Sequence, residues 1–269
     1  MTAAMACLFA LFAWWFSTGA ILLAVRRWDR CDADMRGLVV AGVPFAVFGA
    51  IAAAAAAEMA TVGGIYLGFV AALSLWGFVE LTFLAGVITG PNRQPLAKGA
   101  RGSARFRAAW AVVAWHEIAL VSVLAALVWM ADGAQNAMAA WTFGTLWVAR
   151  VLAKLNLFLG VPGINIEAVP RTLAHIPSYF RQADPSWLFP PTILILSLAT
   201  AMWVSRLFAA PTPEAAATYG LLAALTALAL IEHWMMLLPA ADTRLWRWLM
   251  ALAASRAQDT KTTIRLEQG

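Results

Sequence analysis

Long apolar segments alternate with short polar connections along the whole chain. An α-helix needs about 20 mostly apolar residues to cross the hydrocarbon of a bilayer. Seven segments come close to that length or exceed it, which predicts an all-α, polytopic membrane bundle of about seven helices. The expected spans are Met5–Val25, Leu38–Ala57, Gly64–Thr89, Ala108–Ala131, Ala137–Gly160, Pro190–Phe208 and Ala215–Pro239. The third is long enough to tilt, and the fifth is interrupted by Arg150 and Lys154.

The composition agrees with a chain immersed in lipid. Of its 269 residues, 62% are hydrophobic and only 12% are charged, whereas soluble domains are about half apolar and about a quarter charged. Trp outnumbers Tyr by 14 to 3, and Trp favours the boundary between lipid and water. The net charge of +5 comes without any basic and aromatic nucleic-acid motif, so the expected partner is a lipid bilayer and not a nucleic acid. The two cysteines, Cys7 and Cys31, match no metal or disulfide spacing and are expected to be reduced.

The charges in the connections predict the orientation of the bundle. The odd-numbered connections and the C-terminal tail are rich in Arg and Lys, whereas the even-numbered ones are nearly bare. The basic residues are Arg26, Arg27, Arg30 and Arg36; Arg93, Lys98, Arg101, Arg105 and Arg107; Arg171 and Arg181; and Arg244, Arg247, Arg256, Lys261 and Arg265. Because Arg and Lys stay in the cytoplasm, we expect the N-terminus outside and the C-terminus inside.

The pattern predicts one transmembrane bundle over residues 1–239 and an amphipathic, basic cytoplasmic tail over 240–269. Within the tail, the apolar and basic positions of Thr243–Ala254 favour an amphipathic helix. Within the longest connection, Glu167–Arg181 has apolar residues at helical spacing, which predicts an interfacial amphipathic helix. His175 in that segment is expected to be a surface histidine.

Seven ionisable residues lie inside the expected spans, where a charge is costly and usually faces the interior of a bundle. They are Glu80, His116, Glu117, Arg150, Lys154, Glu232 and His233. At about 1.5 Å per residue, four helices place them roughly 10–15 Å from the cytoplasmic boundary. We therefore expect one polar layer, which is either a single site or a single network of ion pairs.

Several interpretations of this polar layer remain open. Arg150 and Lys154 can neutralise the glutamates and fix helix packing. A di-metal site is disfavoured because its Glu and His ligands lie three residues apart on one face, whereas His116-Glu117 and Glu232-His233 are adjacent and diverge by about 100°. A single histidine can also ligate haem iron or a chlorophyll magnesium. A proton path is disfavoured by the apolar outer halves of the spans. No motif for a catalytic nucleophile, a nucleotide or a metalloprotease zinc is present, so no catalytic residue is predicted and a non-enzymatic role is favoured.

The later two thirds of the chain contain six characteristic runs: Glu80–Pro91, His116-Glu117, Ala153–Pro162, Ser178–Arg181, Glu232-His233-Trp234 with Pro239, and Leu245–Trp248. Together these runs resemble the PuhE family of photosynthetic complex assembly proteins from purple phototrophic bacteria. Within these runs, the residues outside the polar layer that carry the resemblance are Asn156, Gly160, Pro162, Tyr179, Arg181 and Trp234. The chain departs from the family where Gly163 stands in place of an expected Asn. Asn156 itself is expected to satisfy a helix terminus.

The resemblance implies a multi-pass protein of the bacterial cytoplasmic membrane that helps to build the photosynthetic apparatus. It implies reaction-centre or pigment-biosynthesis proteins as partners, and a role in reaction-centre assembly or bacteriochlorophyll supply. Joined to the polar layer, it suggests that His116 or His233 holds bacteriochlorophyll or a precursor, with Glu80, Glu117 and Arg150 around it. Two alternatives stay open: a redox centre with iron or haem in bacteriochlorophyll biosynthesis, and a purely structural scaffold.

Overall fold

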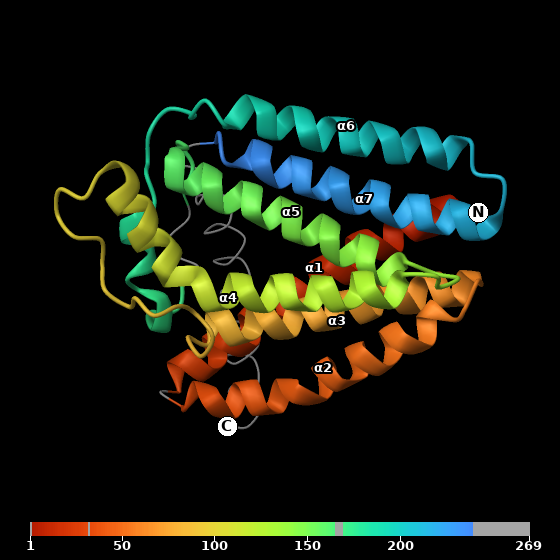
Figure 1. The fold of residues 1–269 in the computed structure, drawn as a ribbon, viewed down its shortest axis with the longest axis horizontal. Helices are drawn as coiled ribbons and strands as arrows, with labels where there is room; N and C mark the ends of the chain where they lie inside the picture. The colour runs from red at the N-terminus through yellow and green to blue at the C-terminus, as the bar shows by residue number, and fades with distance from the viewer. Residues whose placement is uncertain (1, 32, 165–168, 239–269) are drawn as a thin grey trace, which may run out of the picture.

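A computed structural model describes residues 2–31, 33–164 and 169–238 (Figure 1). This part of the chain contains seven α-helices, and each is long and apolar enough to cross a membrane. They are α1 (Thr2–Arg30), α2 (Met35–Ala57), α3 (Val62–Leu84), α4 (Gly102–Ala131), α5 (Met138–Leu159), α6 (Phe189–Phe208) and α7 (Pro213–Met235). The prediction of an all-α bundle with seven spans is confirmed. The predicted tail over 240–269, including Thr243–Ala254, lies outside the described residues.

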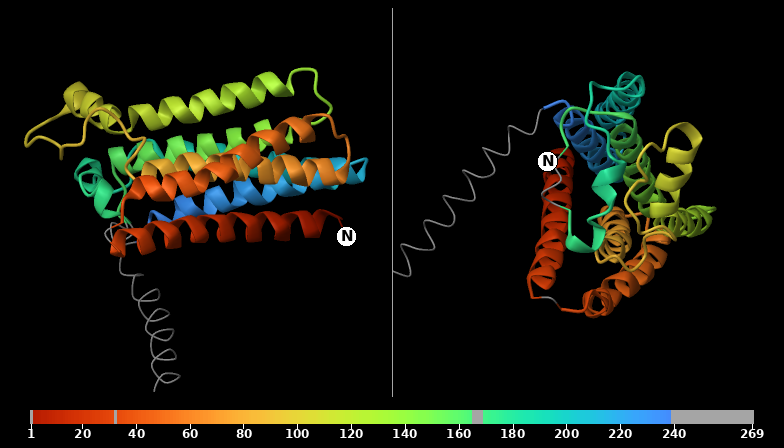
Figure 2. Two further views of the ribbon diagram at one scale, coloured as in Figure 1. Left: turned by 90° about the horizontal axis from the view of Figure 1, so that it is seen from below. Right: turned by 90° about the vertical axis from the view of Figure 1, so that its left-hand side faces the viewer.

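The seven helices lie side by side with their axes close to one direction (Figures 1 and 2). The three connections rich in Arg and Lys gather at one end of the bundle, and the three poor in these residues gather at the other (Figure 1). α3 and α7 are the most enclosed spans, and α1 is the least enclosed. The polar residues of α3, α4 and α5 meet inside the bundle, near its basic end.

Small residues allow the helices to approach closely, as is usual for spans in lipid. A Cβ at Gly49 of α2 would lie 2.9 Å from Leu75 Cγ of α3, and one at Gly220 of α7 would lie 3.0 Å from Ala6 Cβ of α1. Side-chain oxygens fix where helices begin, because they accept hydrogen bonds from free N–H groups of the first turn. Thr61 caps α3 in this way through the N–H of Gly64, and Thr212 caps α7.

The third span ends five residues earlier than predicted. α3 stops at Leu84 and the chain turns at Gly86, whose φ of +73° suits a residue without a Cβ. The following segment, 87–92, is bonded to α4: the N–H of His116 donates to Thr89 O at 3.0 Å, and the N–H of Asn92 donates to Ala111 O at 3.0 Å. In a regular helix the N–H of His116 and the carbonyl of Ala111 bond within the helix. Here both bond to the segment 87–92, and α4 bends in this region (Figure 1).

The predicted interfacial helix over 167–181 is wrong in its described part. That part forms two short 3₁₀ helices, η1 (Arg171–Leu173) and η2 (Ile176–Tyr179). Leu173, Ile176 and Tyr179 recur every three residues, which is the period of a 3₁₀ helix, and all three are buried against the ends of α3 and α4. The connection is therefore packed into the basic end of the bundle.

Candidate functional site

Helix α5 contributes two cations, one helical turn apart, and each pairs with a carboxylate from a different helix. Arg150 Nη2 lies 3.1 Å from Glu80 Oε2 on α3. Lys154 Nζ donates a hydrogen bond to Glu117 Oε1 on α4. The two carboxylates are largely buried. These pairs join α3, α4 and α5 inside the bundle and neutralise four charges of the predicted layer.

His116 is enclosed beside the first of these pairs. Its Nε2 lies 3.7 Å from Glu80 Oε1, its ring centre is 4.3 Å from that of Phe83, and it has no exposed surface. Neither ring nitrogen has a hydrogen-bond partner. The backbone N–H of His116 is the group that donates to Thr89 O, so the turn after α3 holds this histidine against the glutamate.

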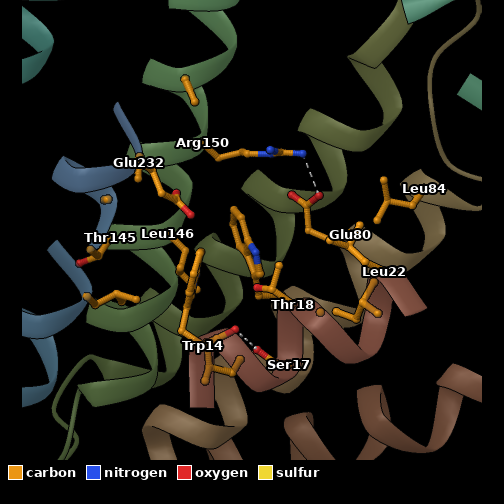
Figure 3. Close-up of a pocket in the computed structure, with 18 residues that line it drawn as sticks. Trp14, Ser17, Thr18, Leu22, Glu80, Leu84, Thr145, Leu146, Arg150 and Glu232 are labelled. Carbon is orange, nitrogen blue, oxygen red and sulfur yellow. Dashed lines mark hydrogen bonds and ion pairs between the residues drawn. The ribbon is translucent and has the colours of Figure 1, made fainter. Parts of the chain in front are cut away.

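A cavity of about 280 Å³ lies between α1, α3, α5 and α7 (Figure 3). We call it the carboxylate cavity because Glu80 and Glu232 line it together with Arg150. Figure 3 shows Arg150 reaching from α5 toward Glu80, with Glu232 on α7 directed inward from another side. Ser17, Thr18 and Thr145 belong to the same lining. The cavity therefore has polar residues from four helices.

A second cavity of about 360 Å³ lies between α4, α5 and η2. We call it the aromatic cavity because seven aromatic residues line it: Phe83, Phe106, Trp110, Trp147, Phe158, Tyr179 and Phe180. Its charged lining residues are Glu117, Arg150 and Lys154. Arg150 lines both cavities, so its pair with Glu80 lies between them, whereas the pair of Lys154 and Glu117 lines the aromatic cavity alone.

The polar layer is thus divided. Glu80, His116, Glu117, Arg150 and Lys154 come together, and Glu232 faces the carboxylate cavity without an ion-pair partner in the described part of the chain. His233 does not join them: its Nδ1 lies 2.7 Å from Ala229 O of its own helix, and it lines neither cavity. Adjacent residues diverge by about 100° around a helix, which explains why Glu232 and His233 have different surroundings.

No three His, Cys, Asp or Glu side chains within residues 2–31, 33–164 and 169–238 are placed to share a metal ion. The di-metal interpretation therefore has no ligand set in this region. His116 and His233 also line neither cavity. An axial bond from either imidazole to a macrocycle would require the surrounding side chains to move.

Asn156 has a different role from the one predicted. It is fully buried, and its Nδ2 donates to Leu152 O and to Thr192 Oγ1 of α6, both at 2.9 Å. It therefore joins α5 to α6 and does not cap a helix with its side chain. α5 ends at Leu159, and the next residue is Gly160, whose φ is +140° and whose N–H donates to Asn156 O.

The remaining family residues fix the basic end of the bundle. Tyr179 donates its hydroxyl to Gln94 O at 2.8 Å, and the backbone N–H of Arg181 donates to Leu157 O at 2.9 Å. Pro162 O accepts a hydrogen bond from Gln182 Nε2, and Trp234 packs edge-on against Phe189. A Cβ at position 163 would lie 2.1 Å from Leu238 O, so the Gly that replaces the expected Asn fits a close approach of two backbones.

Arg105, which the sequence predicts only as a charge in a connection, has a structural role that sequence reasoning missed. Its Nη2 donates to Phe158 O at 2.7 Å and to Tyr179 O at 2.9 Å, and its guanidinium lies 3.9 Å from the centre of the Phe158 ring. A cation at the last carbonyls of a helix is favourable. Nothing in the local sequence distinguishes Arg105 from the neighbouring Arg101 and Arg107.

Comparison with known proteins now places the chain in a family. The family "Protein of unknown function (DUF3623)" matches residues 1–257. The chain belongs to the DUF3623 family. A similar protein is "Uncharacterized 30.4 kDa protein in puhA 5'region" of Rhodobacter capsulatus, which is 46% identical over 245 residues, or 89% of this chain and 88% of the relative. No solved structure matches.

Proposed function

We propose that this chain is a membrane-embedded assembly factor for the bacterial photosynthetic apparatus, acting in reaction-centre assembly or bacteriochlorophyll supply in the cytoplasmic membrane. The observation that carries the proposal is the relative from Rhodobacter capsulatus, which is 46% identical and named for the region 5' of puhA. That name points to a photosynthesis gene region. The resemblance of Glu80–Pro91 and Ala153–Pro162 to photosynthetic assembly proteins points the same way.

The geometry supports a role in holding or handing over apolar molecules more than a role in catalysis. Each cation of α5 is paired with a carboxylate, so neither pair carries a net charge. Two cavities lie beside these pairs, and ligand sites are commonly apolar cavities with a few polar groups. A protein that assists assembly inside lipid needs such a sheltered space and no catalytic group.

A second candidate is a tetrapyrrole-binding or redox protein of bacteriochlorophyll biosynthesis. One observation favours it: His116 Nε2 faces Glu80 Oε1 at 3.7 Å, and Nδ1 of the same buried ring has no hydrogen-bond partner. Carboxylates near a ligating histidine orient it in many metal sites. A purely structural scaffold is the third candidate, and the pairs that join α3, α4 and α5 favour it.

The test is deletion of the gene in its phototrophic host, followed by complementation. Assembly predicts unstable or scarce reaction centre without build-up of a pigment precursor. A role in biosynthesis predicts that a precursor accumulates, and that purified protein carries stoichiometric iron or a porphyrin absorption band. Normal reaction-centre and pigment levels in the deletion strain would refute the proposal.

Complementation with matched variants separates the scaffold from the other two roles. Glu80→Gln removes a paired carboxylate, and Glu58→Gln changes an exposed one at the end of α2. For a scaffold, Glu80→Gln lowers thermal stability while reaction-centre levels follow only the amount of folded protein. For a working site, reaction-centre content falls further than protein abundance, and Glu58→Gln leaves both unchanged.

A further inference from the structure

The aromatic cavity opens toward the lipid. Trp110 and Val121 line it from α4 within the expected span, and they are 50% and 47% exposed. A side chain exposed on the flank of a membrane span faces hydrocarbon, since there is no water at that depth. A molecule dissolved in the bilayer can therefore reach this cavity from the side of the bundle.

Lys154 of α5 lines this cavity and carries hydrogen-bond donors. Trp147 lines the cavity as well, but its indole N–H is covered by other atoms and is not open to a ligand. Of the three ammonium donors of Lys154, one is used by Glu117, and no second acceptor lies within hydrogen-bond distance of it in the described residues. An unpaired donor in apolar surroundings is costly, so an acceptor oxygen is the chemistry that this wall favours.

The charges around the cavity favour an uncharged molecule. Lys154 is neutralised by Glu117, and Arg150 is neutralised by Glu80. A ligand carboxylate would have to compete with Glu117 for the ammonium, and a ligand cation would have to compete with Lys154 for the carboxylate. A neutral carbonyl oxygen can accept a hydrogen bond from Lys154 while the ion pair stays intact.

We propose that the aromatic cavity binds a neutral, lipid-soluble molecule whose carbonyl oxygen accepts a hydrogen bond from Lys154. Its apolar body packs against the aromatic side chains, of which Phe83, Trp110 and Phe158 come from three different helices or their ends. A lipid ester and a quinone both carry this chemistry. The inference stands on the cavity alone and does not rest on the proposed function in photosynthetic assembly.

The binding test uses tryptophan quenching on the full-length protein in dodecyl maltoside, a detergent without carbonyl groups. The probe is the methyl ester of dibromostearic acid, and the matched control is dibromooctadecane, which has a similar brominated chain but no carbonyl. We expect saturable quenching by the ester and at least about tenfold weaker binding of the alkane, as the loss of a charge-assisted hydrogen bond implies. Equal binding of ester and alkane would overturn the proposal.

Three variants assign the quenching to this cavity. Val113→Trp fills the lining and should abolish saturable binding of the ester, whereas Val128→Trp changes an exposed position on the same helix and should leave it intact. The double variant Lys154→Met with Glu117→Gln removes donor and partner together, and should make ester and alkane bind alike. Saturable quenching that survives in Val113→Trp would refute the assignment even if the double variant fails to fold.

The natural ligand is identified by mass spectrometry of molecules extracted from protein purified from host membranes. We expect one ester or one quinone at about one molecule per chain, in the native protein and in Val128→Trp but not in Val113→Trp. Two results would contradict a neutral carbonyl ligand. One is the recovery of acidic lipids alone, and the other is a tightly bound partner protein whose removal opens the cavity to the ester. Because this readout is independent of reaction-centre levels, its failure is distinct from failure of the assembly role.

Discussion

The guanidinium of Arg150 lies 3.1 Å from the carboxylate of Glu80, and this contact joins α5 to α3 between the two cavities. The pair has different surroundings on its two sides. His116 closes one side of the glutamate, at 3.7 Å, while the arginine side chain keeps 38% of its surface exposed and lines both cavities. Glu80 therefore holds Arg150 in position between the two spaces.

Glu80→Gln should lower the free energy of unfolding by about 1–3 kcal/mol, because it leaves a partly buried guanidinium without its charged partner. Arg150→Met should cost a similar amount, and the double variant should cost less than the sum of the two. Thermal unfolding in detergent measures all three, with Glu58→Gln as the exposed control. Additive losses would show that the pair contributes no coupling energy.

Gly90 gives a test of the segment that follows α3. A Cβ at this position would lie 2.2 Å from Ala111 O of α4, so Gly90→Ala should force the segment away from the helix and cost about 2–4 kcal/mol. The matched control is Gly144→Ala in α5, where the nearest atom would be 3.7 Å away and the higher helix propensity of Ala should be neutral or stabilising. Equal unfolding midpoints for the two variants would contradict the close packing of this segment.

Arg105→Gln should loosen the basic end of the bundle. It removes two hydrogen bonds to carbonyls, Phe158 O and Tyr179 O, and the contact with the Phe158 ring. We expect a loss of about 1–3 kcal/mol and faster hydrogen exchange at residues 176–183. Arg107→Gln, an exposed neighbour in α4, is the control. Unchanged exchange in Arg105→Gln would show that these contacts do not hold η2.

His175 predicts a pH dependence outside the spans. Burial, and then the nearby Arg93, lower the pKa of His175 below its usual value of 6.5, and its Nε2 is buried without a partner. The folded state therefore binds the proton less readily than the unfolded state, so stability is unaffected above pH 6.5 and falls as the pH drops below it. Unfolding midpoints between pH 5 and 8 measure this. His175→Gln should flatten the acidic side of the profile, and an unchanged profile would exclude His175 as its source.

The hydrophobic pattern sufficed to predict seven spans, because about 20 apolar residues in a row have few other stable conformations. It failed where apolar residues continue without a helix. Residues 85–89 read as the end of a span, yet Gly86 turns the chain and the next segment bonds to the backbone of α4. The spacing of Leu173, Ile176 and Tyr179 also fits a 3₁₀ period, and the structure shows it by backbone hydrogen bonds between residues three apart, such as Leu173 N–H to Pro170 O. These bonds cannot be read from the sequence.

The polar layer was predictable as a set of residues but not as a set of contacts. Depth along each helix brought Glu80 and Arg150 to one level. The rotation of each helix about its axis decides which side chains contact one another. This rotation is set by the packing between helices, which a single sequence does not show. His116 faces Glu80 of α3, while the adjacent Glu117 faces Lys154 of α5. His233 is at a similar depth but is bonded to its own helix.

The orientation of the bundle remains a prediction from the Arg and Lys of the odd-numbered connections, and Cys31 can test it. This thiol is free and exposed in the connection between α1 and α2, which we expect in the cytoplasm. A membrane-impermeant maleimide should label it in inverted vesicles and not in intact spheroplasts. Asp132→Cys, made in a Cys31→Ser background, places a thiol at an exposed position between α4 and α5 and should show the opposite pattern. If both thiols react from the same side, the up-and-down arrangement is wrong, and if both patterns invert, the basic end faces outward.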